Sequence, residues 1–131
     1  MADLGASELQ VLKAGLQAEY KRLVSEVQDE LMRSGEQHYI DLAGRVTDLG
    51  DQSVADVLAD LDAAMIDRHV HELREIEAAL ARLAGGSYGV CAECGADIGF
   101  HRLKASPVAV RCIDCQARHE KQFAHENQPS L

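Results

Sequence analysis

This chain of 131 residues contains 22 acidic and 13 basic side chains, which gives a net charge of −9 at neutral pH with the histidines uncharged. An acidic chain repels nucleic-acid phosphates, so the charge argues against a protein that binds DNA or RNA directly. Aromatic residues make up only 4% of the chain, which argues against a large globular core, and the lack of a long apolar run or a signal peptide predicts a cytoplasmic protein without membrane contact.

The first predicted element is a long amphipathic helix. Most of its apolar residues recur at alternating spacings of three and four, as on one face of a helix. They are Leu9, Leu12, Leu16, Tyr20, Leu23, Val27, Leu31, Tyr39, Leu42 and Val46. The stripe weakens at Ser34 and Gly35. Because Gly35 and Gly44 each cost up to about 1 kcal/mol of helix stability relative to alanine, we expect a bend or a frayed segment there.

A turn is predicted near residues 47–53, where Gly50 stands between two aspartates. A second apolar stripe follows the turn and ends at Gly85 and Gly86. Its members are Val54, Leu58, Leu61, Met65, His69, Leu73, Ile76, Leu80 and Leu83. We expect His69 to pack on this face as a neutral histidine.

Two helices with narrow stripes and a short turn predict a long antiparallel coiled-coil hairpin over residues 1–84. The second helix, of about 30 residues, would be roughly 45 Å long. We expect a monomer because neither helix has a broad apolar face. A helical bundle formed by dimerisation is the alternative, since a two-helix hairpin buries little surface.

The predicted turn and its flanks are strongly acidic. Between residues 41 and 62 the only basic side chain is Arg45. The acidic ones are Asp41, Asp48, Asp51, Asp56, Asp60 and Asp62. Helix capping accounts for one or two of these, because Asp51 or Ser53 can be the N-cap of the second helix. Capping does not require both Asp48 and Asp51 on a projecting turn, so action of these carboxylates on a partner is the other interpretation.

The last third of the chain carries the most specific chemical signal. Its cysteines form two pairs, Cys91-Ala-Glu-Cys94 and Cys112-Ile-Asp-Cys115, separated by 17 residues. This spacing predicts one zinc ion held by four thiolates, and a closed four-sulfur shell predicts a structural ion with no open position. Gly95 follows the first pair, where a tight turn favours a residue without Cβ.

The charge also differs between the two predicted domains. The hairpin of residues 1–84 holds 17 acidic and 8 basic side chains, whereas the zinc module of residues 85–131 holds five of each. The zinc module therefore lacks the basic stripe of a DNA-binding zinc protein, and a protein is the more plausible partner. The residues near the turn do not form a catalytic constellation that would suggest an enzyme.

The zinc module and the turn together resemble the DksA/TraR family of bacterial transcription regulators. The matching residues of the zinc module are Tyr88-Gly-Val-Cys91-Ala-Glu-Cys94-Gly95, Ile98-Gly99, Arg102-Leu103, Ala105, Pro107 and Cys112-Ile-Asp-Cys115-Gln. The family's Asp-x-x-Asp-x-Ala tip motif is matched by Asp48-Leu-Gly-Asp51-Gln-Ser53, with serine in the last place. The resemblance covers roughly residues 10–122.

The resemblance implies an all-α fold made of a coiled-coil hairpin, a four-cysteine zinc finger and a C-terminal helix. It also implies a regulator that binds RNA polymerase directly, without contacting DNA. The hairpin would enter the secondary channel of the polymerase, bring Asp48 and Asp51 toward the catalytic centre and alter the lifetime of promoter complexes. Arg68 falls where the family places a basic residue that contacts polymerase, although a solvated surface arginine is the simpler interpretation.

One departure from the family concerns the alarmone ppGpp. Responsive family members bind it with basic residues, and the corresponding positions here are Glu75, Ser106 and Gln116. None is basic, so we expect action that does not depend on ppGpp at this surface. Two other classes remain as alternatives, a nucleic-acid-binding zinc ribbon and a thiol redox switch that releases zinc on oxidation.

Overall fold

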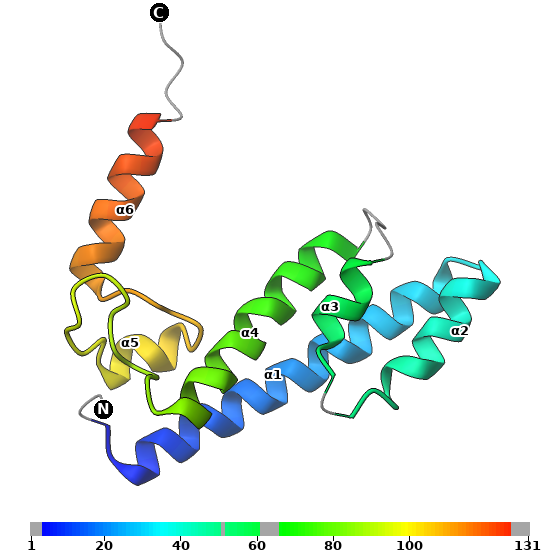
Figure 1. Ribbon diagram of the computed structural model, residues 1–131, viewed down its shortest axis with the longest axis horizontal. Coiled ribbons are helices and arrows are strands. Elements are labelled where there is room, and N and C mark those ends of the chain that lie inside the picture. Colours follow the sequence, from blue (N-terminus) through cyan, green and yellow to red (C-terminus); the bar gives the residue numbers. More distant parts are fainter. Residues whose placement is uncertain (1–3, 51, 61–65, 127–131) are drawn as a thin grey trace, which may run out of the picture. The chain divides into compact units, whose positions relative to one another are not determined.

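The computed structural model describes residues 4–50, 52–60 and 66–126. In this part of the chain the regular elements are α1 (Ala6–Arg33), α2 (Gln37–Val46), α3 (Val54–Ala59), α4 (Asp67–Gly85), α5 (Phe100–Ala105) and α6 (Ile113–Glu126) (Figure 1). An isolated antiparallel bridge joins Val90 and Asp97. The predicted all-α class is confirmed. No helix in the described residues has the length and apolarity needed to cross a membrane.

The chain forms two compact units. The first, which we call the helical unit, comprises residues 14–81 and holds α2, α3 and most of α1 and α4. The second, which we call the cysteine unit, combines the chain up to Lys13 with the chain from Arg82 onward and contains the four cysteines, α5 and α6. The functional division into a hairpin of residues 1–84 and a zinc module of residues 85–131 stays a prediction.

The first apolar stripe is divided between two helices, so the prediction of one helix reaching Val46 was wrong. The Ser34 hydroxyl donates a hydrogen bond to the Leu31 carbonyl (2.6 Å) and accepts one from the Glu36 amide (3.2 Å). These bonds compete with the helical pattern. Gly35 then adopts a φ of 76°, the left-handed conformation that commonly ends helices. The weak point was therefore correctly located, but it reverses the chain instead of bending the helix.

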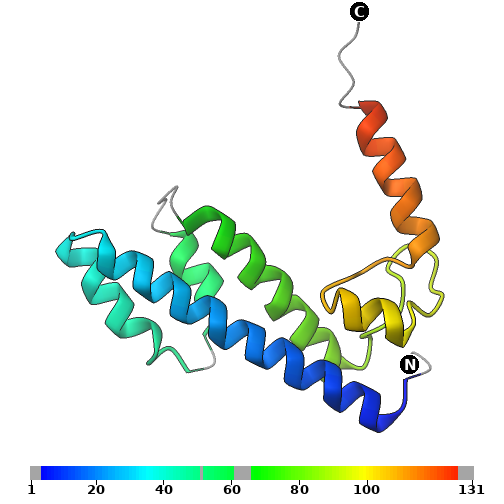
Figure 2. The same ribbon diagram turned by 180° about the vertical axis from the view of Figure 1, so that it is seen from behind.

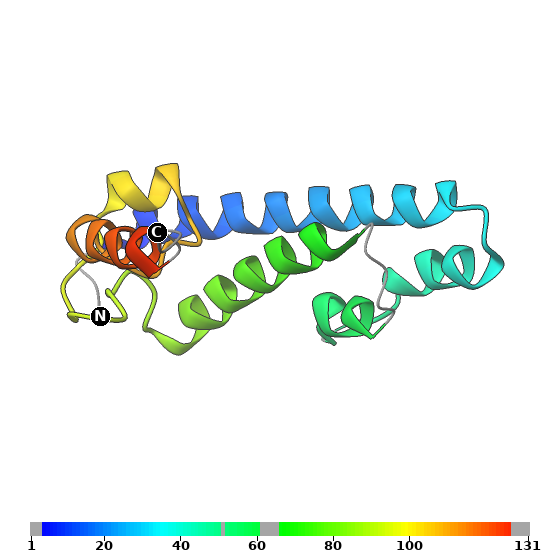
Figure 3. The same ribbon diagram turned by 90° about the horizontal axis from the view of Figure 1, so that it is seen from above.

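The α2 helix runs back along α1 from this reversal. The Gln28 side-chain amide donates a hydrogen bond to the Ala43 carbonyl, with an N–O distance of 3.0 Å. In one continuous helix these two residues would be about 22 Å apart along the axis. Figure 3 shows α2 returning beside the C-terminal part of α1.

The α4 helix lies antiparallel to α1, as the predicted hairpin requires. The Tyr20 hydroxyl donates to the Glu77 carboxylate (2.8 Å), and the His69 ring lies 2.8 Å from the Glu30 carboxylate. Figure 2 shows the two helices side by side from the opposite direction. His69 is half-buried at the predicted position of the second stripe. Leu61 and Met65, which the same stripe includes, lie outside the described residues.

The short α3 helix supplies the fourth element of the helical unit. Ser53 is its N-cap, and the Ser53 hydroxyl accepts a hydrogen bond from the Asp56 amide at 3.0 Å. Of the two capping candidates in the sequence, Ser53 is therefore the one used. Side chains of all four helices meet in one apolar core: Leu16, Leu23, Val27 and Leu31 of α1, Leu42, Ala43 and Val46 of α2, Val54, Ala55 and Leu58 of α3, and Val70, Leu73, Ile76 and Ala79 of α4.

Candidate functional site

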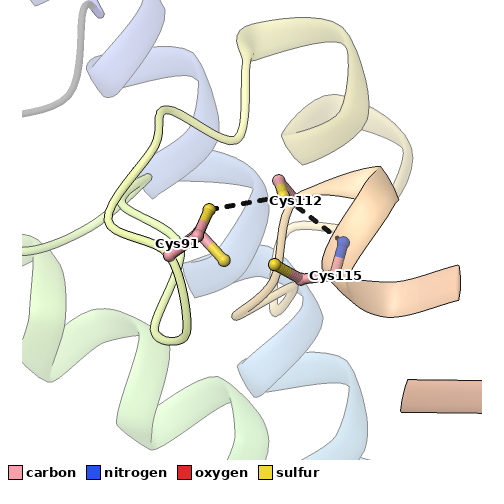
Figure 4. Close-up of side chains that lie close together, drawn as sticks. Cys91, Cys112 and Cys115 are labelled. Atoms are coloured by element: carbon pink, nitrogen blue, oxygen red, sulfur yellow. Dashed lines mark hydrogen bonds between the residues drawn. The ribbon is translucent and has the colours of Figure 1, made fainter. Parts of the chain in front are cut away.

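The four cysteines converge in the cysteine unit as their spacing predicts. All four Sγ atoms lie within 4.8 Å of one another. Figure 4 shows Cys91, Cys112 and Cys115 with their sulfur atoms turned toward a shared space. Cys91 and Cys115 are buried, whereas Cys94 is exposed. Cys112 is partly exposed, so solvent reaches the cluster at Cys94 and Cys112.

Two local structures present the sulfur atoms. The first pair lies on a tight turn, in which the Gly95 amide donates to the Cys91 carbonyl (3.0 Å) and Gly95 has a φ of 76°. The second pair opens α6, where the Gln116 amide donates to the Cys112 carbonyl (2.9 Å). The two structures are joined by a hydrogen bond from the Ala92 amide to the Val110 carbonyl (2.8 Å).

The sulfur positions fit a zinc ion. Zinc–sulfur bonds are about 2.3 Å long, which places the sulfur atoms of a regular tetrahedron about 3.8 Å apart. The Sγ atoms of Cys94 and Cys112 are 3.8 Å apart. Four sulfur ligands complete the tetrahedral shell, so the site holds one structural zinc, whose binding supplies folding free energy.

The thiols differ in how readily they lose their protons. Hydrogen bonding from the backbone amide of Cys94, followed by that of Cys112, lowers the pKa of Cys91 to about 6. Burial raises the pKa of Cys115 to about 12, although the guanidinium of Arg118 lies 3.3 Å from its sulfur. Zinc binds thiolates, so the metal has to displace a proton from Cys115. Acid therefore weakens zinc binding.

Asp48 and Ser53, the two ends of the acidic segment of residues 48–53, do not lie at the C-terminal end of α1. Asp48 is exposed in the turn after α2, and its amide donates to the Arg45 carbonyl (3.0 Å). Asp51 lies outside the described residues. The Ser53 hydroxyl donates to the Glu77 carboxylate at 2.5 Å, which places the segment beside the middle of α4. The expected projecting tip is displaced because the chain reverses at Gly35.

Among the remaining predicted site residues, Arg68 and Glu75 are exposed, whereas Ser106 and Gln116 are half-buried. Arg68, in the first turn of α4, has a side chain that is 88% exposed, and its Nε lies 3.2 Å from the Glu72 carboxylate. A pair this exposed contributes little to stability, so Arg68 can leave it to bind a partner. Of the three positions compared with the alarmone site, Glu75 lies 3.3 Å from the His71 ring and Gln116 donates to Glu120.

Two polar residues of the helical unit were missed by the sequence interpretation. Glu77 accepts hydrogen bonds from the hydroxyls of Tyr20 and Ser53 and from the amide of Val54. Tyr20 was assigned to the apolar stripe of the first helix. A half-buried tyrosine hydroxyl usually has a hydrogen-bond partner, and this signal could have predicted an acceptor on the facing helix.

The family model described as prokaryotic dksA/traR C4-type zinc finger matches residues 86–121. The RNA polymerase-binding transcription factor DksA of Escherichia coli (strain K12) is 31% identical over 114 residues, which cover 82% of this chain and 75% of that protein. The protein of the same name from Caulobacter vibrioides (strain NA1000 / CB15N) is 38% identical over 74 residues, 56% of this chain, and the match spans about half (52%) of that relative.

Among solved structures, transcription factor DksA2 from Pseudomonas aeruginosa resembles the chain with a TM-score of 0.62 and 27% sequence identity. The superposition covers 92% of this chain and 88% of that protein. The likeness therefore extends beyond the zinc finger.

We predict that Cys112→Ser abolishes stoichiometric zinc binding and unfolds the chain from residue 85 onward. Structural zinc supplies on the order of 10–16 kcal/mol in small modules, and three thiolates hold it far less tightly than four. Metal analysis should find one zinc per wild-type chain, lost on acidification, and amide NMR spectra should report the unfolding. Ala92→Ser, which adds a hydroxyl at an exposed position between two ligands, is the control and should keep its zinc. A folded Cys112→Ser module without zinc would contradict the prediction.

Proposed function

Because the chain belongs to the DksA/TraR family, we propose that it is a transcription factor that binds RNA polymerase. The observation that carries this proposal is the match to polymerase-binding relatives over 82% of the chain, with all four zinc-binding cysteines in place. The net charge of −9 supports a protein partner, so the factor acts without binding DNA directly. We infer that the protein works in the cytoplasm, as a monomer and without enzymatic activity of its own.

We propose further that the helical unit enters the secondary channel of the polymerase and that Asp48, Asp51 and Ser53 act near the catalytic centre. The lifetime of promoter complexes changes as a result. The exposure of Asp48 and the acidic character of its surroundings support this role. Because Ser53 is the N-cap of α3, helix capping does not account for the carboxylates of Asp48 and Asp51. The zinc ion has only a structural role.

We predict that Arg68→Glu weakens binding to core RNA polymerase and leaves helicity unchanged. The side chain is exposed, so reversing its charge disturbs little inside the protein but opposes an acidic partner surface. Affinity is measured with labelled protein and core polymerase, and circular dichroism checks the fold. Arg33→Glu, at the end of α1, serves as a charge-matched control. Unchanged polymerase affinity together with a shift of duplex DNA at physiological salt would favour a nucleic-acid-binding zinc ribbon.

We predict that Asp51→Asn abolishes the effect on transcription while polymerase binding stays near wild type, and that Asp48→Asn acts likewise but less severely. Asparagine keeps the shape and removes the charge, so the change tests the carboxylate itself. Asp56→Asn, in the first turn of α3, controls for the loss of one negative charge. In vitro transcription and binding are measured together. A fully active Asp51→Asn protein would show that the carboxylate does not act on polymerase.

We predict that ppGpp does not enhance the action of this protein on a polymerase whose own alarmone site is disabled. Glu75, Ser106 and Gln116 offer no positive charge to a polyphosphate, and Glu75 repels it. In vitro transcription with and without ppGpp makes the comparison. Clear enhancement would mean that other residues bind the alarmone, with Lys104 and Arg118 the first to substitute.

A further inference from the structure

The Glu77 carboxylate joins three helices of the helical unit. One carboxylate oxygen accepts a hydrogen bond from the Ser53 hydroxyl (2.5 Å). The other oxygen accepts hydrogen bonds from the Tyr20 hydroxyl (2.8 Å) and the Val54 amide (3.1 Å). Tyr20 lies on α1, Glu77 on α4 and Val54 at the start of α3. Hydrogen bonds to an ionised carboxylate are stronger than those between neutral groups. Burial, together with Glu77, raises the pKa of Tyr20, so the phenol keeps its proton and remains a donor.

The apolar stripes fit a second arrangement of the same residues. In one continuous helix, Leu31, Leu42 and Val46 would still share a face, because spacings of 11 and four residues stay close to whole helical turns. In the structure, the reversal at residues 34–36 separates α1 from α2. Gly35 lies at that reversal with a φ of 76° and has no atom near the place of a Cβ. Glycine adopts left-handed and helical conformations about equally readily.

We propose that the helical unit switches between this closed bundle and an open two-helix hairpin, and that the hydrogen bonds of Glu77 to Tyr20, Ser53 and Val54 are the latch of the closed form. In the closed form Gly50 and Val54 line a groove with Tyr20 and Val24, beside the middle of α1. Opening joins α1 to α2 and moves residues 47–53 to the end of the hairpin. This inference rests on the proposed function, because the open form is the one that reaches the polymerase channel.

The latch thereby regulates the acidic segment. Polymerase binds the open form. The apparent dissociation constant therefore equals the intrinsic constant of the open form divided by the fraction of molecules that are open. Any change that weakens the latch raises potency without adding a contact to polymerase. The distance between residues 21 and 47 also differs greatly between the two forms, which makes the switch measurable.

Spin labels at residues 21 and 47 test the switch in the free full-length protein. Lys21 and Thr47 line the same groove in the closed form, whereas 26 residues of continuous helix would separate them by about 39 Å. The labels are attached to noncanonical amino acids, so that the cysteines keep their zinc. Pulsed electron–electron double resonance should show mainly the short distance between the labels in the free protein and the long distance after core polymerase is added.

Two matched pairs of variants test the latch and the hinge. Tyr20→Phe removes one donor to Glu77, and Tyr39→Phe makes the same change on α2 as its control. Gly35→Ala disfavours the left-handed turn and favours a continuous helix, while Gly44→Ala favours helix in both forms. Tyr20→Phe and Gly35→Ala should each raise the ratio of long to short distances by roughly tenfold, the change that about 1.4 kcal/mol produces. The controls should leave the ratio within about twofold of wild type.

The outcomes separate this inference from the proposed function. A free wild-type protein that shows only the long distance, or a polymerase complex that keeps the short one, overturns the switch. Equal ratios in Tyr20→Phe, Gly35→Ala and their controls overturn the assigned latch and hinge. If polymerase does not bind at all, the proposed function fails, and the distances in the free variants still decide whether the bundle opens.

Discussion

The apolar stripes of α1 to α4 have to be covered, and this constraint organises the helical unit. A two-helix hairpin with narrow stripes buries little surface per residue. The chain reverses at Gly35, and α2 and α3 then pack against α1 and α4, so that Leu23, Leu58 and Leu73 are almost completely buried. The bundle is built within one chain, as an alternative to the dimer that would cover the same stripes. It also determines where the acidic segment lies.

The cysteine unit is stabilised in another way. Its buried side chains include Tyr88, Ile98 and Leu103, together with Cys91 and Cys115. Such a small core supplies little hydrophobic free energy, and modules of this size commonly depend on a metal. The chain therefore combines a helical unit that can pack in two conformations with a zinc module that its four ligands hold in one conformation.

The two units also differ in how well the sequence predicted them. The zinc ligands were predicted correctly because CxxC pairs are local and each holds its two sulfur atoms at short range. The helical class was predicted because apolar periodicity is also local. Periodicity does not distinguish one continuous helix from two helices that pack together, since both bury Leu42 and Val46. Glu77 was missed because its hydroxyl partners, Ser53 and Tyr20, lie 24 and 57 residues away in the sequence.

The position of the second cysteine pair at the start of α6 has a consequence for that helix. The Cys112 sulfur accepts a hydrogen bond from the Cys115 amide (3.5 Å), and the Cys112 carbonyl accepts one from the Gln116 amide. Most side chains from Ala117 to Ala124 are exposed, and isolated helices of this length are marginal in water because the first turn is costly to form. The metal holds that first turn in place. Zinc thus nucleates α6, and the helicity of the C-terminal segment reports metal occupancy.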